Sequence, residues 1–260
     1  MDMGLDGSRV LITGSSQGIG FGIASAFLDE GATVVLSGRD KNRVETARVN
    51  LAEKYGNKEV DFFVGDLGVG KNRENLKEQL AVEGLDHIIC NIGSGRSMPV
   101  LQESEEEWRR MFEINLFNAV GVVQDLRALL AQTVKKGGDA SLTFVGSICG
   151  MEALGCPLAY ASAKAALWAY AKNLMHPLAK EGIRVNQLSP GNIIFPGSTW
   201  EAKLAQDANS VNSMLASQVA MGRLGELEEV AKAVVFLSCQ HAKFITGTNL
   251  VVDGGQLKGV

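Results

Sequence analysis

The stretch that decides the fold is Val10-Leu-Ile-Thr-Gly-Ser-Ser-Gln-Gly-Ile-Gly20, near the start of the 260-residue sequence. Its first four residues form an apolar run that is typical of a buried strand. The glycines that follow allow a tight turn, and residues of helical composition continue as far as Leu28. The stretch therefore predicts a strand, a glycine-rich turn and a helix in direct succession.

The same alternation continues along the whole chain. Apolar runs that predict buried parallel strands lie at residues 10–13, 33–37, 60–64, 87–90, 141–145, 184–188 and 249–252. Segments of helical composition lie at residues 20–28, 43–54, 105–131, 159–179 and 227–237. We therefore predict a single α/β domain over residues 1–260, a doubly wound seven-stranded parallel sheet of the Rossmann type, with ligands at the carboxyl ends of the strands.

Residues 191–220 interrupt this alternation between the sixth and seventh predicted strands. The segment follows Pro190, carries Phe195-Pro-Gly197 and Trp200, and continues as a polar helical run. Because it follows the carboxyl end of a strand, we expect it to be a substrate lid. The alternative is an ordinary packed helical excursion.

Composition and charge exclude several classes of function. The net charge of −4, without a block of Lys or Arg, argues against binding to nucleic acid or to an anionic membrane. The polar start of the chain indicates neither a signal peptide nor a membrane span, so we expect a cytoplasmic protein. Scattered histidines and the absence of a CxxC pair predict no metal site and free thiols at Cys90, Cys149, Cys156 and Cys239.

The glycine-rich turn predicts a dinucleotide site. A pyrophosphate can approach glycine backbone closely, and the N-terminus of the following helix offers unpaired N–H groups and the positive end of its dipole. The spacing G-x-x-x-G-x-G differs from the common G-x-G-x-x-G and from a P-loop. A purely structural turn is the alternative reading of these glycines.

Three pieces of the sequence occur in the order Thr13-Gly-x-x-x-Gly-Ile-Gly20, Ser147 and Tyr160-Ala-Ser-Ala-Lys164. With these pieces the sequence resembles the classical short-chain dehydrogenases/reductases, including 3-oxoacyl-[acyl-carrier-protein] reductases. The resemblance covers essentially the whole chain. Smaller matching pieces are Asp66-Leu67, Asn91-Ile-Gly93, Asn115-Leu116, Arg184-Val-Asn186, Pro190-Gly191, Thr246-Gly247 and Val252-Asp-Gly-Gly255. The resemblance implies an NAD(P)-dependent oxidoreductase that acts on a carbonyl or a secondary alcohol. It also implies a homotetramer built through the predicted helices 105–131 and 159–179 and the last strand.

The end of the second predicted strand favours the phosphorylated cofactor. Gly38 stands where an acidic residue would hold the ribose hydroxyl of NAD, and Arg39 can pair with a 2′-phosphate, with Ser37 and Ser15 as further donors. A solvated charge is the alternative reading of Arg39. NADP(H) is thus preferred and NAD(H) remains possible. The expected cofactor site, completed by the resemblance, consists of Gly14, Ser15, Gln17, Gly18, Ile19, Gly20, Arg39, Asp66, Leu67, Asn91, Gly93, Tyr160, Lys164, Pro190, Gly191 and Ile193.

Tyr160 and Lys164 provide apparatus for proton transfer. Four residues apart on a helix, they share one face, so that the ammonium is expected to lower the pKa of the phenol towards the working pH. Ser147 follows the fifth predicted strand and can donate a hydrogen bond to the substrate oxygen. The resemblance implies that Asn115 completes a proton relay.

The sequence departs from the family pattern after Gly191. The threonine expected four residues later, which usually contacts the nicotinamide carboxamide, is Phe195. Ser198, Thr199 or the backbone of Ile193 are the candidates to replace it. The contacts around the lid are therefore the least determined part of the predicted site.

The substrate is less defined than the chemistry. We expect its pocket to include Arg96, Ser147, Met151, Cys156 and Trp200. Arg96 can pair with a carboxylate or phosphate, although an exposed loop arginine is commonly only a solvated charge. A 3-oxoacyl thioester reductase and a sugar or nucleotide-sugar dehydrogenase are the two enzyme readings. A catalytically silent NADPH-binding regulator is the alternative class, and the intact Ser147, Tyr160 and Lys164 argue against it.

Overall fold

The computed structural model describes residues 2–56 and 60–259. Its main sheet has seven parallel strands in the order β3-β2-β1-β4-β5-β6-β9. The strands are β1 (Arg9–Ile12), β2 (Thr33–Gly38), β3 (Asp61–Val64), β4 (His87–Cys90), β5 (Ala140–Val145), β6 (Ile183–Pro190) and β9 (Asn249–Val252). The strand order reverses between β1 and β4, so the crevice expected for a ligand opens at their carboxyl ends. The predicted doubly wound sheet is confirmed.

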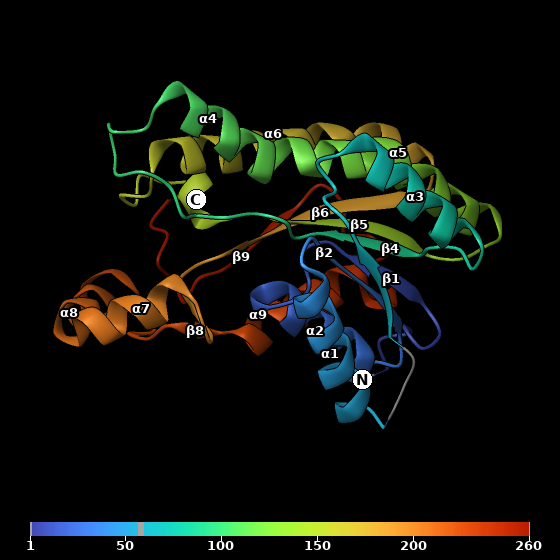
Figure 1. Ribbon diagram of the computed structural model, residues 1–260, viewed down its shortest axis with the longest axis horizontal. Helices are drawn as coiled ribbons and strands as arrows, with labels where there is room; N and C mark the ends of the chain where they lie inside the picture. The colour runs from blue at the N-terminus through green and yellow to red at the C-terminus, as the bar shows by residue number, and fades with distance from the viewer. Residues whose placement is uncertain (1, 57–59, 260) are drawn as a thin grey trace.

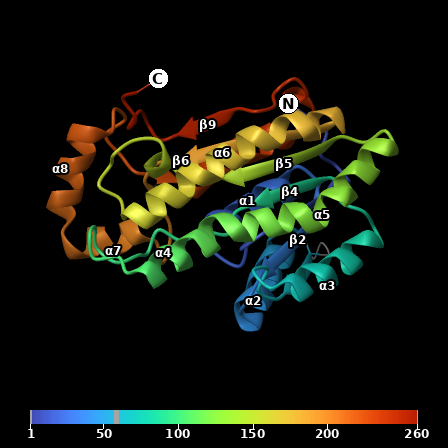
Figure 2. The same cartoon turned by 90° about the horizontal axis from the view of Figure 1, so that it is seen from above.

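Helices cover both faces of the sheet (Figures 1 and 2). One face carries α1 (Gly18–Asp29), α2 (Lys41–Lys54) and α9 (Leu227–Ser238). The other face carries α3 (Gly70–Ala81), α5 (Asn118–Lys135) and α6 (Leu158–Lys180). Helix α4 (Glu105–Phe112) is joined to α5 by a π-helical turn, Glu113–Phe117.

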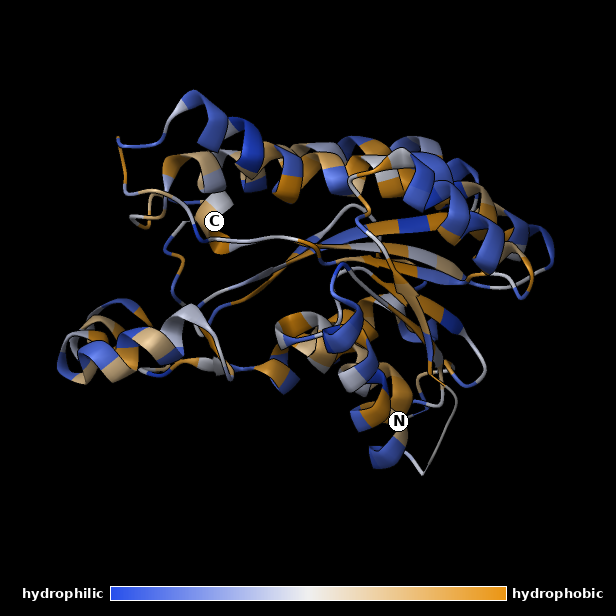
Figure 3. Ribbon diagram, viewed as in Figure 1, coloured by the Kyte–Doolittle hydropathy of each residue, from blue (hydrophilic) through white to orange (hydrophobic). Residues whose placement is uncertain are grey.

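Alternation along the strands divides the core into two halves. In β1, Val10 and Ile12 belong to the cluster under α1 and α9, whereas Leu11 belongs to the cluster under α5 and α6. All three side chains are fully buried. The strands appear accordingly as largely hydrophobic segments between helices with one polar side (Figure 3). Burial of both faces explains the near-continuous apolar runs in the sequence.

The helical stretch Glu105–Lys135 is long and apolar enough to cross a membrane, judged by length and composition alone. Half of its apolar window is buried, and Leu126 and Leu130 are completely enclosed. Helix α5 packs there against α3 and β5. These contacts are those of a core helix, which passes the same test of length and composition.

The segment after β6 builds a separate layer beside the sheet (Figure 1). It contains β7 (Ile193–Ile194), α7 (Thr199–Gln206) and α8 (Ala208–Gln218), and β7 pairs with β8 (Gly225–Glu226). The layer has its own small apolar cluster of Val211, Leu215, Val219 and Leu224. Its helices are therefore packed on one another beyond the carboxyl edge of the sheet.

Candidate active site

A cleft of about 660 Å³ runs along the carboxyl edge of the sheet. Its walls come from the glycine-rich turn, the ends of β2 to β6, helix α6 and the segment after β6. Of the predicted site, the residues that line it are Gly14, Gln17, Gly18, Ile19, Arg39, Asp66, Leu67, Asn91, Gly93, Arg96, Ser147, Tyr160, Lys164, Pro190 and Gly191. The fold thus brings most of the predicted cofactor residues, and three of the four predicted catalytic residues, into one cavity.

The glycine-rich turn has a backbone conformation that requires glycine at two positions. Gly14 and Gly18 have φ values of 64° and 59°, a region that favours glycine. A Cβ at Gly20 would lie 2.5 Å from Asn91 Nδ2, so Gly20 is required for packing rather than for lining the cleft. Asn91 Nδ2 donates to the carbonyls of Thr13 and Gly14. The turn therefore leaves the N-terminus of α1 facing the cleft, as a pyrophosphate requires.

The hydroxyl of Ser15 cannot serve the role expected for it. It donates to the carbonyl of Ile12 at 2.8 Å and accepts the N–H of Ser37 at 2.9 Å, and the residue is completely buried. Ser16 and Arg43 line the cleft instead. Arg43 could have been predicted from the sequence as a cleft residue, because it lies four residues after Arg39, in the first turn of α2.

Arg39 lies at the end of the cleft formed by β2 and β3. Its side chain is 73% exposed, and Nη1 lies 3.6 Å from Asp66 Oδ2. A pair this exposed contributes little to stability, so the guanidinium is free to exchange partners. The cleft wall at this end contains two arginines, Arg39 and Arg43, and one serine, Ser16.

Ser147, Tyr160 and Lys164 face the other end of the cleft. Ser147 follows β5 and begins the short 3-10 helix Ile148–Gly150, where its Oγ accepts the N–H of Cys149 at 3.2 Å. Tyr160 and Lys164 lie in the first two turns of α6. Lys164 Nζ donates to the carbonyl of Val145 at 2.8 Å. The three side chains lie near the carboxyl end of β5 because α6 packs against the short 3-10 helix that follows it.

Burial shifts the pKa values of both groups on α6. Burial raises the pKa of Tyr160, and its hydrogen bond with Ser147 acts in the opposite direction. Burial lowers the pKa of Lys164 to about 8. The net shift of the phenol's pKa is upward, opposite to the lowering expected from Lys164. Tyr160 is therefore protonated at neutral pH.

Asn115 lies behind the cleft rather than in its wall. It is 1% exposed and sits in the π-helical turn. Its Oδ1 accepts the N–H of Ser94 at 2.9 Å, and its Nδ2 donates to the carbonyls of Ser94 and Met111. A Cβ at Gly93 would lie 2.9 Å from Asn115 Oδ1 and 3.0 Å from Lys164 Nζ. Asn115 thus fixes the segment after β4 close to Lys164.

Three predicted substrate residues lie outside the cleft wall. Met151 is exposed, and its Sδ accepts a hydrogen bond from Asn249 Nδ2. Trp200 packs on the small core of α7 and α8. Cys156 forms a disulfide with Cys149, across a sequence separation of 7. Ile193, a predicted cofactor residue, is buried in β7.

The disulfide corrects the expectation of four free thiols. Cys149 and Cys156 lie in the segment between Ser147 and Tyr160, which folds back on itself and brings them together. Cys90 and Cys239 are free, as expected, and both are buried. Among the described residues, no three His, Cys, Asp or Glu side chains are placed to hold a metal ion.

Phe195 packs on the glycine-rich turn. A Cβ at Gly18 would lie 2.9 Å from Phe195 Cε2, so this aromatic ring occupies space that a side chain at Gly18 would need. Ser198 is occupied in capping, because its Oγ accepts the N–H groups of Phe195 and Glu201. Thr199 lines the cleft. Of the three candidates to replace the missing threonine, Ser198 and Thr199 both line the cleft, but the hydroxyl of Ser198 is already used in capping.

A doubly wound sheet with a glycine-rich turn and a Ser, Tyr and Lys set in one cleft defines a dinucleotide-dependent oxidoreductase. A family model described as enoyl-(acyl carrier protein) reductase matches residues 14–256. The chain belongs to the short-chain dehydrogenase/reductase family, so the resemblance found in the sequence is confirmed. Members of this family act on carbonyl or CH–OH groups.

The individual relatives differ in substrate. The 3-oxoacyl-[acyl-carrier-protein] reductase of Chlamydia muridarum is 33% identical over 94% of this chain and 95% of its own. The glucose 1-dehydrogenase of Gluconobacter oxydans is 30% identical over 96% of this chain and 91% of its own. A structure of L-sorbose reductase from Gluconobacter frateurii, complexed with NADPH and L-sorbose, is 31% identical with a TM-score of 0.91 and full coverage of both chains.

Proposed function

We propose that the protein is an NADP(H)-dependent carbonyl reductase in which Tyr160 is the general acid. The observation that carries this proposal is that Ser147, Tyr160 and Lys164 share one cleft with the glycine-rich turn. A cofactor bound along this cleft would place its nicotinamide end beside Tyr160. When bound, NADPH supplies the hydride that reduces the substrate carbonyl.

The residues of the chain handle the charge and the proton. Ser147 and Tyr160 donate hydrogen bonds to the substrate oxygen, which stabilises the negative charge that develops there. Tyr160 then delivers its proton to this oxygen. The raised pKa of Tyr160 keeps that proton available. Lys164, positively charged below about pH 8, stabilises the phenolate that remains.

The cofactor preference rests on the end of β2. Gly38 carries no acid that would repel a 2′-phosphate, and Arg39 and Arg43 lie beside it in the cleft wall. The glycine-rich turn offers backbone N–H groups to the pyrophosphate. These features favour NADP(H) over NAD(H), and the NADPH complex of L-sorbose reductase supports the same preference.

Replacing Tyr160 by Phe tests the proposal. We expect Tyr160→Phe to lower kcat/KM for ketone reduction by about 10²-fold to 10⁴-fold, because the proton donor is lost. NADPH binding, measured by fluorescence titration, is expected to change little. Tyr170→Phe is the matched control, since Tyr170 lies on the same helix but packs edge-on against Phe144. Substantial reduction by Tyr160→Phe would reject its assignment as the acid.

The relatives support two substrate classes, thioesters and sugars. A panel of 3-oxoacyl thioesters and sugar ketones, followed by NADPH oxidation, separates them. NADPH binding without turnover of any member would instead support a silent regulator. We further propose a cytoplasmic homotetramer formed through α5, α6 and the edge strand β9, for which sedimentation equilibrium measures the subunit number.

A further inference from the structure

The cleft is divided electrostatically into two halves. Within the described residues, its wall contains two carboxylates, Asp40 and Asp66, both near the ends of β2 and β3. Each lies within an ion-pair distance of an arginine of that half, Arg43 and Arg39 respectively. The catalytic half of the wall contains Arg96, Arg110 and Lys164 and no carboxylate. The charged side chains that line the catalytic half are therefore all positive.

The positive charges of the catalytic half are not equally available. Arg110 is held by Glu107 through two short hydrogen bonds of 2.7 Å. Lys164 is buried and bonded to the carbonyl of Val145. Arg96 is exposed, and among the described residues no carboxylate lies within ion-pair distance of it. Arg96 is thus the cation of the catalytic half whose charge is left for a ligand.

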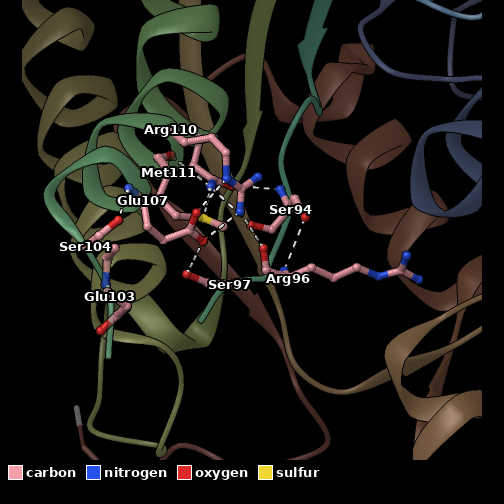
Figure 4. Close-up of polar contacts among 10 residues, drawn as sticks. Ser94, Arg96, Ser97, Glu103, Ser104, Glu107, Arg110 and Met111 are labelled. Atoms are coloured by element: carbon pink, nitrogen blue, oxygen red, sulfur yellow. Dashed lines mark hydrogen bonds and ion pairs between the residues drawn. The ribbon is translucent and has the colours of Figure 1, made fainter. Parts of the chain in front are cut away.

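The backbone of Arg96 is fixed from two sides (Figure 4). Its N–H donates to Ser94 Oγ at 3.2 Å, and its carbonyl accepts from Arg110 Nη2 at 2.9 Å. Ser97, the next residue, donates to Glu107 Oε1. The side chain of Arg96 extends away from this group in Figure 4. The guanidinium is therefore carried on a rigid segment, which reduces the entropy lost on binding.

The segment that carries Arg96 passes Tyr160, and the guanidinium contacts the segment after β6. A Cβ at the preceding residue, Gly95, would lie 3.6 Å from Tyr160 Cζ. Arg96 Nη2 donates to the carbonyl of Gly197 at 3.0 Å. This neutral acceptor uses one of the five N–H donors of an arginine and leaves its charge unbalanced. The remaining donors match the two oxygens of a carboxylate or phosphate.

We infer that the natural substrate carries an anionic group, a carboxylate or a phosphate, a few bonds from its carbonyl, and that Arg96 binds this group. This inference rests on the proposed carbonyl reduction and specifies its substrate class. With the carbonyl at Tyr160, the anion reaches Arg96 beside Gly197, so substrate binding joins the segment after β4 to the segment after β6.

Matched pairs of ketones test the inference. Levulinate is compared with its methyl ester, and dihydroxyacetone phosphate with dihydroxyacetone, which separates carboxylate from phosphate recognition. We expect at least one anionic member to exceed its neutral partner in kcat/KM by about tenfold to a hundredfold. In Arg96→Ala this ratio should fall to about one while reduction of the neutral partner persists. Arg96→Lys should retain part of the preference, because it keeps the charge without the fork.

Arg109→Ala is the matched control, because Arg109 is an exposed arginine of α4 that pairs with Glu105 and does not line the cleft. A preference for the neutral partners, or an unchanged ratio in Arg96→Ala, would overturn the inference. Calorimetric titration of malonate into the NADP⁺-loaded protein gives a readout without turnover. Binding at least tenfold weaker in Arg96→Ala supports the anion site, and equal binding rejects it, even if the Tyr160 chemistry itself fails.

Discussion

Lys164 illustrates how a single residue carries both a cost in stability and a function. The side chain is 4% exposed, yet it ends in an amine that donates a hydrogen bond to the carbonyl of Val145. Desolvation penalises its charged form and lowers its pKa from 10.5 to about 8. At neutral pH the folded protein therefore holds a charge that the unfolded chain would solvate better.

Replacing Lys164 by Met should stabilise the protein. Because its folded pKa lies below its unfolded pKa, the unfolded chain binds more protons between these two values, and the parent gains stability as the pH rises through them. Lys164→Met should raise the free energy of unfolding by up to about 3 kcal/mol at pH 7, and by roughly half as much at pH 9.5. Urea unfolding at both pH values measures the difference.

The exposed Lys180, at the end of the same helix, provides the control substitution Lys180→Met. It should have little effect at either pH. A Lys164→Met protein that is less stable than the parent at pH 7, or a gain that does not shrink with pH, would contradict the assigned cost of burial.

At the scale of one element, the start of α6 depends on a distant cap. Its N-cap residue, Pro157, offers no side-chain hydrogen bond. Glu103, in the loop before α4, accepts the N–H of Ala159 at 2.8 Å, directly before Tyr160. Figure 4 shows Glu103 beside Ser104 at the start of α4. The carboxylate thus caps the catalytic helix and connects it to the loop that carries Arg96.

Removing this cap should loosen the first turn of α6. We expect Glu103→Ala to lower the free energy of unfolding by about 1 kcal/mol, the usual value for a helix cap. It should also lower kcat, because Tyr160 is no longer held in register, while NADPH affinity stays unchanged. Glu103→Gln keeps an acceptor oxygen and should restore most of kcat. Gln102→Ala, at the exposed neighbouring position, is the control, and an equal loss of kcat there would refute the capping role.

Across the whole molecule, the cofactor cleft connects both halves of the core. Its wall includes α1 residues from one face and α6 residues from the other. A ligand that binds only the folded state raises the free energy of unfolding of the whole protein. The increase is about 2.7 kcal/mol at a ligand concentration one hundred times its Kd. Cofactor binding should therefore be visible as an increase in Tm.

NADPH should raise the Tm more than NADH at equal concentration, because Arg39 binds the extra phosphate. In Arg39→Ala the two cofactors should give similar shifts. Differential scanning fluorimetry measures this comparison, with Arg48→Ala as the control, since Arg48 lies on α2, pairs with Glu45 and does not line the cleft. An undiminished advantage of NADPH in Arg39→Ala would exclude the phosphate role.

The alternation of strands and helices and the identity of the turn follow from local sequence. Apolar runs, glycines and the spacing of Tyr160 and Lys164 act over a few residues, where backbone geometry and burial of both sheet faces leave few alternatives. Helix α3 was not predicted from the sequence. It buries only Leu76 and Leu80 among mostly polar residues, so its hydrophobic periodicity is weak. The short β7 and β8 likewise lack any run long enough to recognise.

The contacts that complete the candidate site depend on segments far apart in the chain. The sequence by itself determined the doubly wound sheet, the glycine-rich turn and the Ser147, Tyr160 and Lys164 set. Only the tertiary structure decided that Ser15 is enclosed, that Cys149 pairs with Cys156, and that Arg96 reaches Gly197 across a separation of 101 residues. The reason is physical: periodicity fixes which face of an element is buried, whereas the partner of a polar side chain is fixed only when the sheet order brings its loops together.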